Sequence, residues 1–191
     1  MKKILATVLL LCITCAALIG LTSCSGKVND NTLYYLSKDD GTYEVVELKD
    51  VENAEITIGD TFNKIKITSI GKEAFIHCMS IRFMYVVDEY LESIGEFAFK
   101  DCCNMKLITL PNSLTTIGDC AFWDCDALRT VSFNGTGLTT IGSAAFSGCR
   151  NLTSISYGGT IEQWNAVTKG DNWDNDTGAY TIHCSDGDIA K

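Results

Sequence analysis

Cysteine is the residue type with the clearest chemical potential in this sequence, which holds ten cysteines and only two histidines. Thiolates bind zinc when several ligands converge at short loop spacings, and they act as nucleophiles or redox centres when a base or second thiol is close. Beyond residue 24 no Cys-x-x-Cys pair occurs. Four cysteines instead recur at intervals of 24, 23 and 24 residues: Cys78, Cys102, Cys125 and Cys149. Because equivalent positions of stacked repeats lie within about 5 Å of one another, this spacing predicts a buried column of small apolar side chains, not a metal site.

Three further cysteines, Cys103, Cys120 and Cys184, lie off this column. An exported chain can form disulfides. Because three is an odd number, at least one of these thiols stays free or pairs with a cysteine of the column. The spacing favours no particular pairing.

The other reactive residue types form no recognisable catalytic group. The histidines are His77 and His183, and a hydrolase needs a base beside an activated serine or cysteine. The sequence has no Gly-x-Ser-x-Gly, phosphate-binding loop, His-Glu-x-x-His or dinucleotide-binding glycine pattern. Residues 172–178 are rich in Asn and Asp, but Thr177 interrupts the run and its twelfth position is His183, unlike an EF-hand loop. We therefore predict no catalysis, no metal and no cofactor.

The elements that position these residues come from a repeated pattern, Ile-Gly-x-x-Ala-Phe-x-x-Cys. It begins at Ile70, Ile94, Ile117 and Ile141, and a Ser or Thr precedes each isoleucine. A fixed period of roughly 20 to 30 residues is typical of a solenoid, in which each unit buries its apolar face against its neighbours.

Within one repeat the apolar spacing changes from the period of a helix to that of a strand. Residues 94–105 are apolar at intervals of four, four and three, the spacing of one helical face. Residues 107–110 then alternate, as in a strand. The Ser or Thr before each isoleucine can cap the helical turn. Each repeat is therefore predicted to be a short helical turn, a strand and a connecting turn.

The repeats resemble the BspA-type (Treponema-like) leucine-rich repeat family. Residues 104–125, with Leu-Pro-Asn-Ser-Leu-Thr-Thr-Ile-Gly followed by Ala-Phe and Cys, are nearly the family consensus, and the resemblance covers about residues 56–183. It implies an α/β repeat fold: a short right-handed solenoid with parallel strands on one face and short helical segments on the other. Members of this family are generally regarded as adhesins for host or microbial surface proteins and matrix, so the resemblance implies a binding function.

Residues 1–23 are predicted to be a lipoprotein signal peptide. Lys2 and Lys3 precede an uncharged apolar run over residues 4–20, which is typical of a secretory signal. The sequence Leu-Thr-Ser-Cys at 21–24 resembles the bacterial lipobox, which implies that Cys24 becomes the acylated first residue of a protein anchored in the bacterial cell envelope and exposed at the surface. The alternative is an uncleaved transmembrane helix, because the run is nearly long enough to span a bilayer.

The mature chain is predicted to have four parts: a polar tether at 24–32, an N-terminal β cap at 33–69, four repeats at 70–157 and a C-terminal cap at 158–191. Residues 33–36 and 42–46 flank a loop that contains Gly41 and predict a hairpin. Residues 55–58 and 64–67 predict strands that lead into the first repeat. At the other end Trp164, and with it Trp173, is expected to close the core because aromatic side chains bury a large area.

The surface available for binding is the outward side of the strands. The candidate ligand-binding residues alternate with core residues there: Phe83, Tyr85, Val87, Leu107, Thr109, Thr130 and Ser132. Contiguous apolar side chains such as those of the first repeat often mark partner sites. The alternative is that the N-terminal segment or a neighbouring loop covers Phe83 and Tyr85.

The net charge of −9 argues against nucleic acid as a partner. The sequence thus predicts a non-catalytic, adhesin-like surface protein that binds a protein or an extracellular matrix component, with a glycan as a further class of ligand. One alternative is a structural or accessory envelope lipoprotein that organises partners or captures glycans. An enzyme with an unrecognised site is the other.

Overall fold

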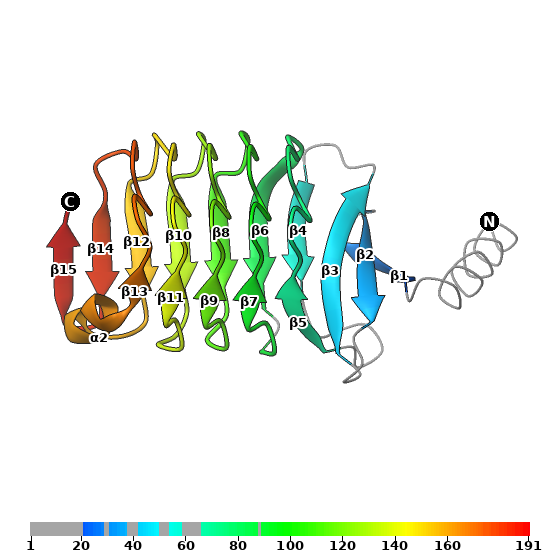
Figure 1. Ribbon diagram of the computed structural model, residues 1–191, viewed down its shortest axis with the longest axis horizontal. Helices are drawn as coiled ribbons and strands as arrows, with labels where there is room; N and C mark the ends of the chain where they lie inside the picture. Colours follow the sequence, from blue (N-terminus) through cyan, green and yellow to red (C-terminus); the bar gives the residue numbers. More distant parts are fainter. Residues whose placement is uncertain (1–20, 29–30, 38–41, 50–53, 59–65, 88) are drawn as a thin grey trace, which may run out of the picture.

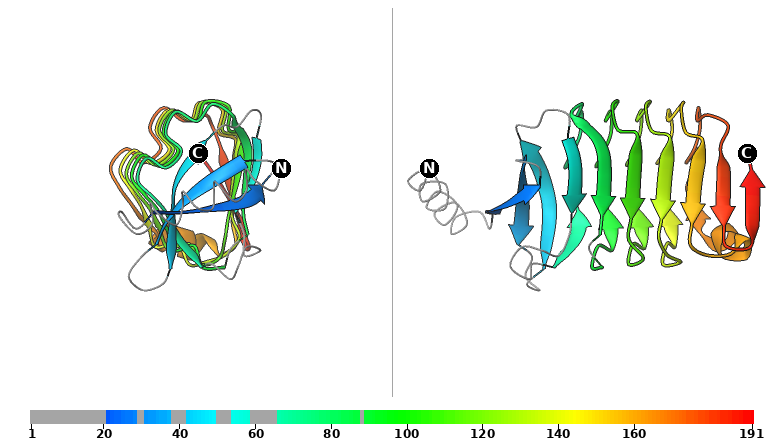
Figure 2. Two further views of the ribbon diagram at one scale, coloured as in Figure 1. Left: turned by 90° about the vertical axis from the view of Figure 1, so that its right-hand side faces the viewer. Right: turned by 180° about the vertical axis from the view of Figure 1, so that it is seen from behind.

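The computed structural model describes residues 21–28, 31–37, 42–49, 54–58, 66–87 and 89–191. These residues wind into an elongated solenoid whose turns stack along the long axis (Figure 1). Strands β1 to β3 lie at one end, and α2, β14 and β15 lie at the other (Figure 1). Seen end-on, successive repeats superpose (Figure 2). The parallel-strand solenoid predicted from the repeat is confirmed.

One long sheet contains the strand that was predicted in each repeat. Six parallel strands follow one another across it: β4 (Ala54–Ile58), β6 (Ile81–Val86), β8 (Leu107–Leu110), β10 (Thr130–Phe133), β12 (Ser154–Tyr157) and β14 (Thr181–Cys184). A last strand, β15 (Gly187–Ala190), pairs antiparallel with β14. Equivalent residues are in register: Ile108 is opposite Val131, which is opposite Ile155. Because strand side chains alternate, one set of equivalent residues points into the solenoid in every turn.

A second sheet lies across the core from the first. Its strands are β1 (Leu21–Val28), β2 (Asn31–Ser37), β3 (Tyr43–Lys49), β5 (Ile67–Ile70), β7 (Ser93–Ile94), β9 (Thr116–Ile117), β11 (Thr140–Ile141) and β13 (Thr168–Lys169). The expected hairpin is present as β2 and β3, with Tyr35 opposite Val45. From β3 onward the pairing is parallel.

The N-terminal segment differs from a free tether. In this structure of the full chain β1 and β2 take in residues 24–28 and 31–32, which were predicted to be part of a tether, and Cys24 is opposite Leu33. An extended segment beside an edge strand satisfies backbone groups that the edge leaves unpaired. The predicted signal peptide lies outside the described residues, apart from positions 21–23. Within the described ranges, no helical segment combines the length and the apolar character needed to cross a bilayer.

The segments predicted to be short helical turns are instead chains of hydrogen-bonded turns. In the second repeat the Ala98 N–H donates to the Gly95 carbonyl (3.3 Å), and the Cys102 N–H donates to the Phe99 carbonyl (3.1 Å). Each bond spans three residues, whereas an α-helix bonds over four. In the described part of the chain the α-helix is α2 (Ile161–Ala166), which begins at a capping box formed by Thr160 and Gln163.

Backbone geometry explains why these turns do not become a helix. Phe97 and Asp101 have positive φ angles of 56° and 58°, which lie outside the helical region. The Phe99 N–H points to the next repeat and donates to the Ala121 carbonyl at 2.7 Å. The apolar spacing of four, four and three still directs side chains into the core, since Ala98 and Cys102 are fully buried. The Ser and Thr residues expected to be caps lie in the short strands β5, β7, β9 and β11.

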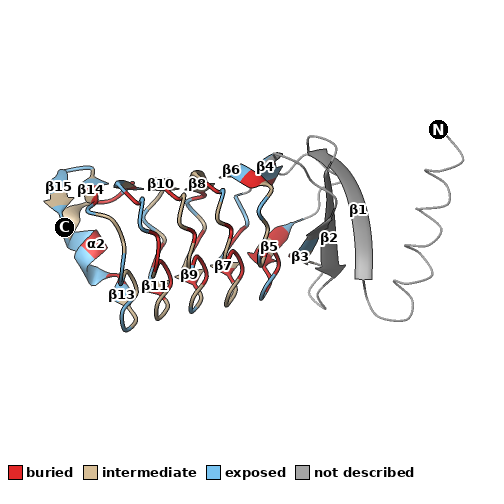
Figure 3. Ribbon diagram, turned by 90° about the horizontal axis from the view of Figure 1, so that it is seen from above, coloured by how far each residue is buried: buried red, intermediate tan, exposed pale blue. Residues whose placement is uncertain are grey.

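A stack of phenylalanine rings runs through the core of the repeats. The centroids of Phe75 and Phe99 are 4.9 Å apart, and their planes differ by 3°. Phe99 and Phe122 (5.0 Å) and then Phe122 and Phe146 (4.8 Å) continue the stack. Buried residues therefore recur at the same place in each turn (Figure 3).

The stack ends on tryptophan. Trp173 and Phe146 form a T-shaped contact with centroids 6.1 Å apart and planes at 89°. Trp164 is buried and packs against Trp173 and Tyr157, with centroids 6.2 and 5.3 Å away. These contacts agree with the expected closing role of the two tryptophans, which stays a prediction.

The glycine of each Ile-Gly pair allows the repeats to approach. A Cβ added to Gly118 would lie 2.7 Å from the Glu96 nitrogen and 2.8 Å from the Gly95 carbonyl carbon. Both atoms belong to the backbone of the preceding repeat, which cannot move aside as a side chain can. Glycine at this position is therefore a packing requirement.

Candidate binding face

The outward residues of the long sheet form two straight rows across the strands. The first row is Glu55, Phe83, Leu107, Thr130, Ser154 and Thr181. The second row is Thr57, Tyr85, Thr109, Ser132, Ser156 and His183. The structure therefore brings six of the seven candidate residues into two adjacent rows. The seventh, Val87, follows the end of β6.

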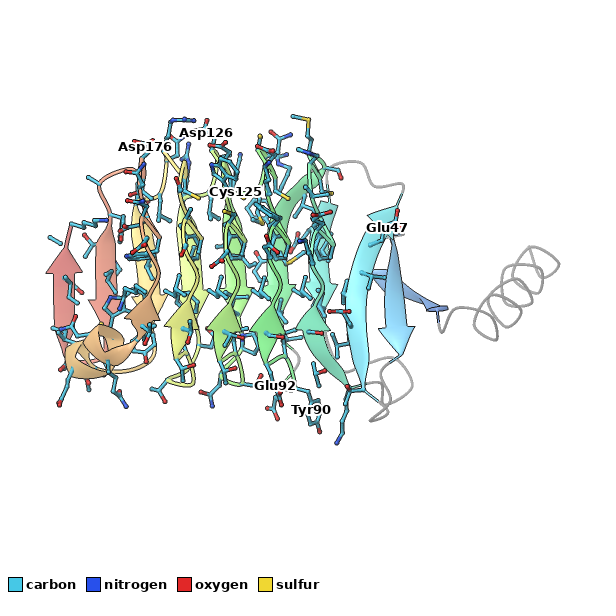
Figure 4. The ribbon with its side chains drawn as sticks, in the orientation of Figure 1. Glu47, Tyr90, Glu92, Cys125, Asp126 and Asp176 are labelled. Carbon is cyan, nitrogen blue, oxygen red and sulfur yellow. The ribbon has the colours of Figure 1, made fainter. Side chains whose placement is uncertain are left out.

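The apolar part of this face lies toward the N-terminal end of the solenoid. Phe83, Tyr85 and Leu107 are half-buried, and Val87 is 58% exposed. Tyr90 is 39% exposed, lies at the edge near the end of β6 (Figure 4), and has the Lys66 ammonium 4.9 Å from its ring centroid. Toward the C-terminal end the same rows carry hydroxyl groups and, on β14, the imidazole of His183. We call Phe83, Tyr85, Val87 and Leu107 the apolar patch.

A line of positive charge adjoins the first row. Arg82, Lys106 and Arg129 occupy equivalent positions at the start of β6, β8 and β10, and we call them the basic strip. The Lys106 N–H donates to the Arg82 carbonyl (2.8 Å), and the Arg129 N–H donates to the Lys106 carbonyl (2.9 Å). Sequence reasoning missed this strip. The sequence does contain a signal for it. The fourth residue after each column cysteine is a cation in the first three repeats and Thr153 in the last.

Three of the four column cysteines, Cys102, Cys125 and Cys149, are buried as predicted, whereas Cys78 in the first repeat is only partly buried. Cys125 lies inside the solenoid, whereas the next residue, Asp126, lies at its outer edge (Figure 4). The Cys125 thiol donates to the Phe99 carbonyl oxygen at 3.0 Å, and the Cys149 thiol donates to that of Phe122 at 3.2 Å. Burial raises the pKa of both thiols well above the usual range of a cysteine thiol. These thiols are therefore poor nucleophiles and poor metal ligands.

The cysteines off the column are partly exposed. Cys103, Cys120 and Cys184 are free thiols in this structure. Burial is the largest cause that raises the pKa of each, and neighbouring carboxylates add to it. Among the described residues, no three His, Cys, Asp or Glu side chains converge in a way that could hold a metal ion.

The histidines each face a carboxylate on the surface. His77 Nδ1 is 3.1 Å from an oxygen of Asp101, and His183 Nδ1 is 3.0 Å from Asp188 Oδ1. Ser156 is opposite His183 in register, so a hydroxyl, an imidazole and a carboxylate lie on three consecutive strands. Acyl transfer also needs N–H donors aimed at the developing oxyanion, but the N–H groups of paired strands point within the sheet.

The Asn- and Asp-rich run after α2 forms a turn that uses its own polar groups. Asp174 accepts a hydrogen bond from the Tyr180 hydroxyl and forms an ion pair with the Lys191 ammonium. The Thr177 hydroxyl donates to the Asp174 carbonyl at 3.0 Å. Asp174 is thus already neutralised by side chains of the chain itself.

Comparison with known proteins agrees with this architecture. The family described as "BspA type Leucine rich repeat region" matches residues 53–167 in six copies. No curated protein sequence matches the chain significantly.

Several solved bacterial structures share the fold. The leucine-rich repeat protein TpLRR of T. pallidum is 23% identical with a TM-score of 0.63, over 72% of this chain and 61% of that one. A leucine-rich cell surface protein from Faecalibacterium prausnitzii A2-165 is 22% identical (TM-score 0.50), over 78% of this chain and 42% of that one. The pneumococcal vaccine antigen PcpA is 22% identical (TM-score 0.54), over 78% of this chain and 36% of that one. This chain therefore spans less than two thirds of each of these proteins.

Proposed function

The chain belongs to the BspA-type leucine-rich repeat family, and from that membership we propose that it is a cell-surface protein that binds other proteins through the outward face of its long sheet. The partner is a host or microbial surface protein or a matrix component. Cys24, acylated after removal of residues 1–23, anchors the protein in the bacterial envelope. The F. prausnitzii protein with this fold is itself described as a cell surface protein, which supports the location.

The apolar patch carries this proposal. Phe83 and Leu107 are neighbours in register, as are Tyr85 and Thr109, so aromatic and aliphatic side chains from two repeats share one surface. Exposed apolar groups rimmed by polar ones are typical of protein interfaces. The ladder hydrogen bonds already hold the strands in place, so a partner meets a preformed surface and little ordering is needed on binding.

A binding screen of the purified full chain tests the proposal. The immobilised chain is exposed to a panel of matrix proteins and to a panel of polysaccharides, with the Tyr85→Ala chain as the matched control. We expect saturable binding of at least one protein by the parent and weaker binding by the variant. Binding of polysaccharides alone would contradict the proposal and favour the accessory role.

A further inference from the structure

We propose that the basic strip binds a short acidic segment of the protein partner, whose neighbouring apolar side chains contact the apolar patch. This inference rests on the proposed protein-binding function and adds the chemistry of the partner. Arg82, Lys106 and Arg129 supply the positive charge, and Phe83 with Leu107 supplies the apolar contact.

The strip is straight and continuous with the first row of the sheet. Its three residues are linked in order by backbone hydrogen bonds, so neighbouring positions are about 4.8 Å apart, the spacing of adjacent strands. Lys106 and Leu107 both lie between the buried residues Met105 and Ile108, so both are on the outside of the solenoid. A segment that contacts strip and patch together must cross the strands along the solenoid axis.

The strip cations have no ion-pair partner among the residues that the structure describes. Lys66 and Lys169 also lack one there, but Lys66 lies over the Tyr90 ring and Lys169 donates to the backbone carbonyls of Trp164 and Val167. Lys72 Nζ is 2.8 Å from Glu96 Oε2, and Arg150 Nη1 is 3.6 Å from Asp126 Oδ1. Lys191 is likewise paired, with Asp174. In a chain of net charge −9, three neighbouring cations left without a carboxylate indicate a ligand that supplies carboxylates.

The residues at the two ends of the strip limit the length of that ligand. Thr153 occupies the next equivalent position after Arg129. At the other end Glu55, which is exposed, is opposite Phe83 in register. A long polyanion such as a sulfated glycan would extend beyond the strip and meet Glu55, whereas a short acidic peptide segment would not. Arginine forks also match carboxylate geometry in two parallel hydrogen bonds.

Two synthetic peptides and one polyanion test the inference on the full chain. The probes are a short peptide in which glutamate and phenylalanine alternate, its counterpart with glutamine for glutamate, and dextran sulfate. The strip variant combines Arg82→Gln, Lys106→Gln and Arg129→Gln. The control variant combines Lys72→Gln, Lys100→Gln and Arg150→Gln, which removes the same charge elsewhere.

We expect the strip variant to bind the glutamate peptide about tenfold or more weakly than the parent does, and the control variant to bind it within about twofold of the parent. Added salt should weaken the parent much more than the strip variant. Arg82→Lys with Arg129→Lys, which keeps the charge but removes the guanidinium forks, should bind the glutamate peptide more tightly than the strip variant and more weakly than the parent. Unfolding midpoints of all variants show that the fold is intact.

Three results would overturn the inference: equal losses in strip and control variants, equal binding of the two peptides, or binding of dextran sulfate without binding of the glutamate peptide. Failure of the proposed function gives a different result. In that case Tyr85→Ala binds the glutamate peptide as the parent does, while the strip variant still loses it. If Tyr85→Ala weakens binding of the glutamate peptide and the strip variant does not, the proposed binding through the apolar face stands and the role of the basic strip is refuted.

Discussion

The Cys125 thiol donates a hydrogen bond to the carbonyl oxygen of Phe99 in the preceding repeat, at 3.0 Å. The same oxygen accepts the Cys102 N–H at 3.1 Å. Cys149 has the same relationship to Phe122. An alanine side chain lacks the sulfur atom, so it would leave a small space and one lone pair of a buried carbonyl without a donor. The cysteine column is therefore both a packing element and a weak hydrogen-bonded link between repeats.

The ring stack should contribute much more to stability than the thiols do. Phe122 is fully buried between Phe99 and Phe146, so Phe122→Ala should lower the free energy of unfolding by about 3 to 5 kcal/mol through the cavity it leaves. Cys125→Ala should cost only about 1 kcal/mol, because the Phe99 carbonyl keeps its bond to the Cys102 N–H. Chemical denaturation of both variants measures these losses. A Phe122→Ala chain that unfolds at the parent midpoint would refute the register of the core.

Stability should fall as the pH rises above about 9 in reducing buffer. Burial holds the pKa of Cys125 and Cys149 above that of an unfolded thiol. Below the unfolded pKa both states keep the proton, so these thiols give no pH dependence. Above it the unfolded chain loses protons that the folded chain retains, and each thiol lowers the free energy of unfolding by about 1.4 kcal/mol per pH unit. Denaturation midpoints between pH 7.5 and 10 should decline less steeply for Cys149→Ala, and identical slopes would contradict this assignment.

Much of the fold follows from the sequence because the repeat period fixes which residues stack. The alternation at 107–110 correctly placed Ile108 in the core and Leu107 outside. The helical interpretation of 94–105 was wrong because consecutive turns produce the same four, four and three spacing. Only the backbone distinguishes them, and the positive φ angles of Phe97 and Asp101 occur at residues other than glycine, where a sequence gives little warning.

The binding face was predictable in position but not in charge. Strand alternation located the two rows, because side-chain direction has a period of two. The basic strip was missed because its residues lie where the strands begin, Arg82 as the second residue of β6 and Lys106 directly before β8. There two consecutive residues, such as Lys106 and Leu107, face outward and the alternation is broken. Comparing the fourth residue after each column cysteine would have found it.

Substitution of Cys24 tests the prediction that the protein is anchored in a membrane. Cys24→Ala should abolish acylation and release the chain from the membrane or leave it unprocessed, because the lipobox enzyme requires the cysteine sulfur as the site of lipid attachment. Several acyl chains on one residue are enough for stable anchoring, whereas one chain gives reversible binding. Cells labelled with a clickable fatty acid report the modification directly. Equal label on variant and parent would rule out the lipoprotein assignment.

The location of the binding site is tested by one aromatic residue and one hydroxyl on the same row. Tyr85 and Ser156 both face outward in the second row, three strands apart on β6 and β12. Tyrosine in a desolvated contact is a frequent hot spot, so Tyr85→Ala should weaken partner binding by about 2 kcal/mol or more. Ser156→Ala should leave it nearly unchanged. If the N-terminal segment covers Tyr85, the variant will instead lose thermal stability while the folded fraction binds normally. Affinity and melting temperature measured on the same two variants separate these outcomes, and lost stability with intact binding would move the site to the turns.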